Sequence, residues 1–238
     1  MALASYISQT QSLLHDTAGT LYSTASLTTY INQARGQIAA EGMCIRSVLT
    51  LSTVASQQSY LLSTISVASV TGAQYVLVVR KAAHAVGAAN PARLDGRPWD
   101  YFFNYCLTKP TTATPTTWSQ LSQGQGGQFY LYPTPVAGGT LTLDCVLIPV
   151  DLVDDTTVEL IPWPWTTAVC YYAAYLAYMN AQRNADADRM WQLYQQKMQR
   201  ARDMTTPSTL PRNFPLSNQV SGVPTVTPGP FPGAQGGS

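Results

Sequence analysis

The spacing of apolar residues changes twice along this chain, and this change limits the possible folds more than any other feature. Up to about residue 43 the apolar positions recur roughly every 3.6 residues, as at Leu27 and Ile31, which is typical of helices. From Cys44 to Ile161 apolar and polar residues alternate, which is typical of strands. The helical spacing then returns. We therefore expect helices from the two ends of the sequence to pack together, with a sheet inserted between them in sequence.

The segment Pro162-Trp163-Pro164-Trp165 ends the strand region, because proline has no N–H to donate to a sheet. Thr166 or Thr167 can cap the helix that follows. We expect helices at about 2–14, 26–41 and 166–203, the last one bent or split at the polar segment 184–188. The sequence thus predicts an α+β fold: a helical bundle of the N-terminal helices and the long C-terminal helix, an inserted antiparallel β-sheet or sandwich, and an extended Pro-rich C-terminal arm. The predicted domains are 1–43, 44–161, 162–204 and 205–238.

Short β-rich segments with Gly and Pro punctuation predict the strands of the inserted domain, at 47–54, 60–65, 75–79, 128–132 and 140–148. Gly138-Gly139 predicts a hairpin between the last two. A long irregular stretch, Lys81 to Gln128, separates the earlier strands from the later ones. In the second helix Arg35 and Glu41 lie off the apolar stripe, so we expect them on a solvated or interfacial face, and Gly42 lies where a left-handed residue would end the helix.

The C-terminal arm, 205–238, has no hydrophobic periodicity and contains seven of the 16 prolines. A segment of this composition cannot form its own core and is expected to be extended. Its residues 233–238 read as a plain tail. The stretch Leu210–Pro215 differs, because one arginine and one aromatic ring stand between prolines. Five arm residues are therefore the candidates for contact with a partner: Arg212 and Phe214 first, their neighbours Pro211 and Pro215, and more weakly Phe231.

Charged residues are scarce, with three lysines, two glutamates and a net charge of +1. This balance excludes an ordinary, strongly basic nucleic-acid-binding protein. It also removes electrostatic protection against self-association, which suits a subunit of an assembly. No stretch approaches eighteen unbroken apolar residues, and the N-terminus lacks the features of a signal peptide, so we expect no membrane segment.

The residue types that carry chemistry have no partners at useful spacing. His15 and His84 are the only histidines, and the sequence has no Gly-x-Ser-x-Gly turn for a nucleophile. We expect His15 at a helix end and His84 in a loop of small residues. The four cysteines, Cys44, Cys106, Cys145 and Cys170, show no metal-binding spacing, so we expect reduced, buried thiols. The sequence thus predicts no catalytic residue, no cofactor and no metal site.

Three other features have an ordinary structural interpretation beside a functional one. Asp151, Asp154, Asp155 and Glu159 follow a predicted strand, where aspartates favour turns, and they lack the glycine and glutamate positions of a calcium loop. The glycine-rich segment 123–127 lacks the Lys-Ser/Thr of a phosphate loop and suits a hairpin tip or an inter-subunit loop. Six aromatic residues could form a sugar-binding platform, although packing in a core or interface is more common: Trp118, Phe129, Tyr130, Tyr132, Trp163 and Trp165.

Taken together, several segments resemble one known group. Leu27–Arg35, which contains Ile-Asn-Gln-Ala-Arg, resembles the Ile-Asn-x-Ala-Arg helix of head-to-tail adaptor proteins of tailed bacteriophages, especially short-tailed ones. Other segments look like the same group, at 118–120, 128–133, 143–152, 161–165, 171–177 and 200–202. The resemblance covers roughly residues 1–215 and rests on the order of the segments.

This resemblance implies a structural virion protein that forms a ring, usually of about twelve copies. Such a ring would sit between the capsid portal protein and the tail nozzle protein at the head–tail interface, after synthesis in the host cytoplasm. Double-stranded DNA would pass through its channel during packaging and ejection without sequence-specific binding. Two other interpretations remain open from the residues. One is a carbohydrate-binding β-sandwich module of a tail or secreted protein, and the weaker one is a hydrolase that uses Asp151 to Glu159.

Overall fold

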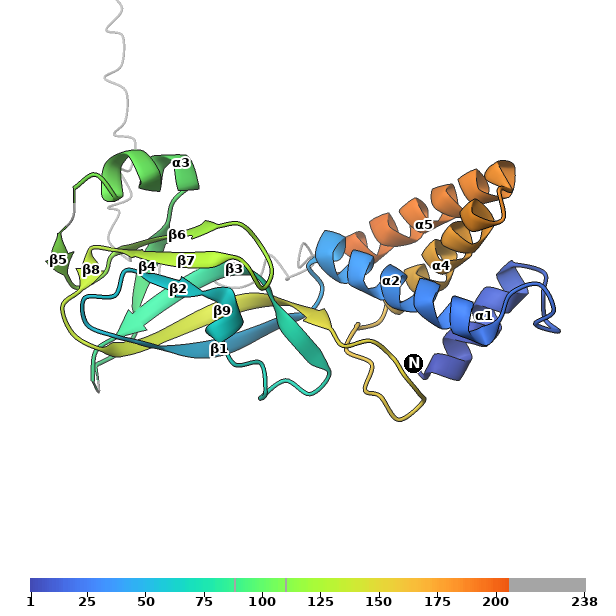
Figure 1. Ribbon diagram of the computed structural model, residues 1–238, viewed down its shortest axis with the longest axis horizontal. Coiled ribbons are helices and arrows are strands. Elements are labelled where there is room, and N and C mark those ends of the chain that lie inside the picture. The colour runs from blue at the N-terminus through green and yellow to red at the C-terminus, as the bar shows by residue number, and fades with distance from the viewer. Residues whose placement is uncertain (88, 110, 206–238) are drawn as a thin grey trace, which may run out of the picture.

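The computed structural model describes residues 1–87, 89–109 and 111–205. It has five helices and a curled, mixed β-sheet, so the predicted α+β class is confirmed. Four of the helices, α1, α2, α4 and α5, gather at one end of the molecule, and the sheet forms the other end (Figure 1). The arm residues singled out above, including Arg212 and Phe214, lie outside the described residues.

Helices α1 (Leu3–Leu13) and α2 (Thr24–Gly42) form close to the predicted positions. The Ser23 side chain accepts a hydrogen bond from the Ser26 N–H at 3.2 Å and caps α2, so this helix begins two residues before the predicted start at 26. The left-handed residue that ends α2 is Met43, with φ of 46°, and not Gly42. Gly42 serves another purpose, because a Cβ there would lie 2.6 Å from the Trp165 ring.

The helix predicted over 166–203 is two helices, α4 (Thr166–Asn180) and α5 (Asn184–Thr205). The connecting turn includes Gln182 in a left-handed conformation, with φ of 57°. Helix α4 packs against α1, α2 and α5. It can do so because small residues face its neighbours, and Ala173, Ala174 and Ala177 are fully buried.

Seven strands form the main sheet in the order β1-β9-β3-β4-β6-β7-β2. Their bounds are β1 Arg46–Thr53, β2 Ser59–Leu61, β3 Ala73–Ala85, β4 Ala92–Gly96, β6 Thr117–Leu121, β7 Gln128–Tyr132 and β9 Gly139–Pro149. Two short strands, β5 Thr112–Ala113 and β8 Thr134–Pro135, pair separately. A 3-10 turn at Leu62–Thr64, helix α3 (Trp99–Tyr101) and a π-helical turn at Phe102–Cys106 complete the elements.

The sequence predicted an antiparallel sheet, but the strand pairing is mixed. Strand β4 pairs with β6 in parallel, and β5 pairs with β8 in parallel. The predicted hairpin at Gly138-Gly139 is also wrong. Strand β9 pairs with β1 and β3, whereas β7 pairs with β6 and β2. The glycine-rich segment 123–127 does connect an antiparallel pair, β6 and β7, as predicted for a hairpin tip.

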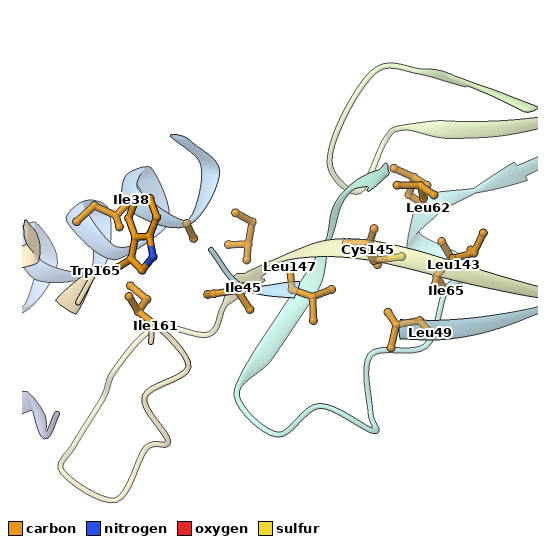
Figure 2. Packing of buried hydrophobic residues seen from close by; sticks show 14 of the residues in the cluster. Ile38, Ile45, Leu49, Leu62, Ile65, Leu143, Cys145, Leu147, Ile161 and Trp165 are labelled. Carbon is orange, nitrogen blue, oxygen red and sulfur yellow. The ribbon is translucent and has the colours of Figure 1, made fainter. Parts of the chain in front are cut away.

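A continuous cluster of buried apolar side chains joins the helices to the sheet. In Figure 2, Ile38, Ile161 and Trp165 lie together at the helical side, and Ile45 and Leu147 lead from them into the sheet. Strand β9 carries most of this connection, because its residues 145–147 are fully buried. The helical end and the sheet end therefore share one core.

Candidate interaction surfaces

The first polar cluster of the molecule lies where the loop after β9 crosses α2. Arg35 has only 1% of its side chain exposed, so the sequence prediction of a solvated or interfacial position is wrong. Its Nε and Nη2 atoms each donate to one carboxylate oxygen of Glu159 at 3.0 Å. Its Nη1 donates to the Val150 carbonyl at 2.8 Å and to Asn32 Oδ1 at 3.2 Å. A buried arginine is tolerated here because every one of these groups compensates its charge.

Asn32 completes the same cluster, one turn before Arg35. Its Nδ2 donates to the Leu152 carbonyl at 3.0 Å, and its Oδ1 accepts from the Leu152 N–H at 2.8 Å. Burial and the nearby Glu159 carboxylate raise the pKa of Tyr6, so this phenol stays neutral. We call Asn32, Arg35 and Glu159 the junction clamp. It fixes the loop 150–161 to α2, so the Ile-Asn-Gln-Ala-Arg segment has a structural role.

The carboxylates considered as a catalytic or calcium site are used locally. Asp154 Oδ1 accepts from the hydroxyl and the N–H of both Thr156 and Thr157, and these hydrogen bonds hold the pKa of Asp154 below its usual value. Asp155 accepts from the Ala4 N–H at 2.7 Å, in the first turn of α1. Glu159 belongs to the junction clamp. Within the described residues no three His, Cys, Asp or Glu side chains come together to hold a metal ion.

His84 lies in strand β3 and is buried, so its predicted place in a loop of small residues is wrong. Its Nε2 lies 3.1 Å from Thr53 Oγ1, and its Nδ1 has no hydrogen-bond partner among the described residues. Burial lowers the pKa of His84, which keeps the ring neutral. His15 follows α1 and is exposed. The two histidines thus have separate structural surroundings.

An exposed group of aromatic rings lies on α3 and the π-helical turn, and we call residues 99–106 the aromatic turn. Its outward side chains are Tyr101, Phe103 and Tyr105, which are 44%, 56% and 59% exposed. The rings of Tyr101 and Tyr105 are 5.0 Å apart. Arg97 lies over the Tyr101 ring at 5.4 Å. In Figure 1 this turn lies over β6 and β7, away from helices α1, α4 and α5.

The aromatic turn is held firmly from beneath. Phe102 is fully buried and contacts the rings of Tyr130 and Tyr132 on β7, with centroids 6.0 and 6.3 Å away. The Leu107 N–H donates to the Phe102 carbonyl at 3.1 Å and closes the π-helical turn. Trp99 packs on Tyr130 at 4.9 Å. Because Phe102 and Cys106 are buried beneath them, the outward rings form a preorganised apolar surface.

The sugar-binding platform considered from the sequence is not assembled. Trp118 and Phe129 stack inside the sheet at 5.2 Å, and Trp165 is buried against the helices. Of the six aromatic residues, Trp163 is the one with a largely exposed side chain. The segment Arg97–Phe103 lies within the irregular stretch Lys81 to Gln128 and was not among the sites predicted from the sequence. The sequence signal for this surface is the number of aromatic residues close together, because one buried face cannot accommodate all of them and some must be exposed.

A second exposed surface surrounds Trp163, which is 69% exposed. Beside it is a hollow of about 210 Å³, whose lining includes Thr167, Lys197, Arg200 and Met204. Thr167 and Lys197 also line an adjoining hollow of about 330 Å³. We call these residues the Trp163 surface. It joins the start of α4 to the last turns of α5, so it belongs to the helical end, whereas the aromatic turn belongs to the sheet.

The predicted contact residues Pro211, Arg212, Phe214, Pro215 and Phe231 lie outside the described residues, so they stay predictions. Among the described residues, no helix has both the length and the apolar character needed to cross a membrane.

Comparison with known proteins defines the class of this molecule. A family model described as SU10 adaptor protein matches residues 1–215, which include every element of the structure and the start of the arm. The chain is thus a phage adaptor, a structural component of the virion. It belongs to the SU10 adaptor protein family, and the predicted resemblance to phage head-to-tail adaptors is confirmed. No curated protein matches it.

Proposed function

We propose that this protein forms a ring of about twelve copies that joins the capsid portal protein to the tail nozzle protein and extends the DNA channel. The observation that carries the proposal is the family match over residues 1–215, which covers both the helical end and the sheet end. The positions of the two exposed surfaces support it. An adaptor within a ring needs separate contacts for its neighbours and for the structures above and below, and such contacts are rich in aromatic residues.

In this proposal the helices α1, α2, α4 and α5 act as one bundle, and the sheet is a domain inserted into it. The contacts of α4 with the other three helices support this arrangement. The molecule carries no catalytic activity, and its polar clusters hold the fold. DNA passes through the channel without sequence-specific binding, which accords with the small net charge of +1.

Electron microscopy of portal complexes tests the ring. Purified protein is added to portal complexes and to virions that lack the adaptor, and the particles are imaged in negative stain. We expect an added ring of density on the portal, at the position where the nozzle attaches. Particles that show no added density at saturating protein would contradict the proposal.

The arm has its own test. Deletion of residues 206–238 should leave the thermal unfolding of the remaining chain nearly unchanged, because the core lies within residues 1–205. It should impair attachment to the partner ring, because Arg212 and Phe214 are then missing. Full occupancy of portal complexes by the truncated protein would show that the arm is a passive tail.

A further inference from the structure

Two charges lie beside the rings of the aromatic turn: the Arg97 guanidinium, 5.4 Å from the Tyr101 ring centroid, and the Asp100 carboxylate. Asp100 is exposed in α3, next to Tyr101, and no hydrogen bond or ion pair reaches its carboxylate from the rest of the described chain. The exposed rings of Tyr101, Phe103 and Tyr105 surround this part of the surface with apolar area. A ligand that fits must bring apolar or proline groups for the rings and a cation for the carboxylate.

The arm of the same chain has this chemistry. Its segment Pro211-Arg212-Asn213-Phe214-Pro215 holds one cation and one aromatic ring between two prolines. Arg212 is the only charged side chain in residues 206–238. Proline-containing segments bind aromatic surfaces at low entropic cost, because their extended conformation is already favoured. The family match ends at residue 215, so it includes this segment and leaves out the rest of the arm.

We propose that residues 211–215 of one copy bind the aromatic turn of a neighbouring copy. Arg212 pairs with Asp100, while Phe214 and the two prolines cover the exposed rings of Tyr101, Phe103 and Tyr105. This inference rests on the proposed ring. Because the contact joins different surfaces on two copies, repeating it can close a ring.

The lengths of the elements favour a neighbour over the arm's own copy. Helix α5 ends near the point where α2 leads into β1, since Arg202 donates to the Glu41 carbonyl. Strand β1 lies beside β9, and the aromatic turn lies over β7, four strand positions beyond β9. Four such steps of about 4.8 Å follow the curve of the sheet, and Figure 1 shows that the aromatic turn is also displaced along the strands, away from α4 and α5. The six residues from Thr205 to Pro211 span at most about 21 Å when fully extended. To bind within its own copy, this short segment would have to span the displacement along the strands as well as the steps across the sheet.

Site-specific crosslinking of the full chain tests the proposal. Phe214 is replaced by the photoreactive residue p-benzoylphenylalanine, and this unlabelled protein is mixed with ¹⁵N-labelled native protein under the conditions that form the ring. We expect crosslinked peptides that pair position 214 of the unlabelled copy with residues 99–105 of a labelled copy. Crosslinks confined to unlabelled pairs, crosslinks to another region, or no crosslink would each overturn the inference.

Substitutions on the receiving surface provide a second test. The double change Tyr101→Ser and Phe103→Ser should lower the yield of this crosslink at least about tenfold, because contacts with buried aromatic rings dominate such interfaces. The control is Val48→Ser, an exposed apolar residue on β1, which should leave the yield unchanged. An equal yield in both variants would overturn the proposal. Electron microscopy of the same samples separates the two hypotheses: rings without this crosslink refute the inference alone, whereas the absence of rings refutes the proposed function too.

Discussion

The junction clamp and the aromatic turn use side chains in opposite ways. At the clamp, the charged residues Arg35 and Glu159 are almost completely buried and satisfy each other's hydrogen bonds. At the turn, large apolar rings are exposed to solvent. Soluble proteins usually show the reverse arrangement. In this chain with few charges, the buried pair Arg35–Glu159 helps to hold the helical end and the sheet end together. The exposed surface is left apolar, where partners can bind.

The largest expected effect breaks the clamp. The substitution Glu159→Ala leaves the Arg35 guanidinium buried without its counter-charge, so the free energy of unfolding should fall by about 3–5 kcal/mol. Urea unfolding of the purified protein measures this change. The control is Asp151→Asn in the same loop, an exposed residue that should change stability by less than about 0.5 kcal/mol. Equal free energies of unfolding for Glu159→Ala and Asp151→Asn would show that the junction clamp contributes nothing to stability.

Substitution of an exposed aromatic residue should weaken binding to partners and leave folding stability nearly unchanged, in contrast to Glu159→Ala. For Trp163→Ser we expect little change in unfolding, but a loss of about 2 kcal/mol or more in binding to the portal or to neighbouring copies, as at an interface hot spot. Sedimentation of portal complexes with added protein measures the binding. Val48→Ser is the matched control, because it also removes an exposed apolar side chain. If Trp163→Ser destabilised the free protein and left binding intact, the two regions would not differ as described.

The close packing of Gly42 against Trp165 should give a smaller change in the free energy of unfolding. A Cβ at Gly42 would lie 2.6 Å from the Trp165 ring, so Gly42→Ala should cost about 1–3 kcal/mol through overpacking. Gly36 in the same helix has open space around its Cβ position. Gly36→Ala should therefore stabilise the protein by about 0.5–1 kcal/mol, because alanine favours the helix. Urea unfolding of both variants checks this difference in sign, and two changes of the same sign would contradict the packing.

Sequence reasoning succeeded where the determining interactions are local. The apolar stripe of α2 and the alternating residues of β1 and β9 predicted those elements near their observed positions, whereas the apolar run at 75–79 predicted only part of β3. The last helix is split, which was one of the two outcomes predicted for it, but the break lies at residues 181–183 and the segment 184–188 begins α5. These features depend on residues a few positions apart. The division into four domains stays a prediction.

The remaining features depend on distant partners. Arg35 looked exposed because its counter-charge, Glu159, stands 124 positions away in sequence. The parallel pairing of β4 with β6 joins residues 22 positions apart, such as Asp95 and Thr117, and no local pattern indicates it. The aromatic turn was placed in an irregular stretch because a five-residue π-helix leaves no period to detect.

The smallest expected effect concerns pH and the buried His84. Burial lowers the pKa of His84 in the folded protein, whereas in the unfolded chain it returns to near 6.5. The unfolded state therefore takes up a proton first as the pH falls, and stability declines below about pH 6.5. The decline stops once the pH is below the folded pKa, and above neutral pH this histidine has no effect. Between about pH 7.5 and pH 5, native protein should therefore lose stability relative to His84→Gln, because only the native chain takes up a proton at position 84 on unfolding.

Urea unfolding at a series of pH values measures this difference, and His15→Gln is the matched control. His15 is exposed, so its substitution removes a histidine without changing the buried core. Glutamine at position 84 keeps a polar group for the Thr53 hydroxyl but cannot take up a proton in this range. If native protein and His84→Gln showed parallel stability curves, the imidazole of His84 would be able to bind a proton inside the sheet at no cost in stability. The buried position of His84 would then contribute nothing to the pH response, and any acid sensitivity would have to come from carboxylates such as Asp154, whose lowered pKa acts at more acidic pH.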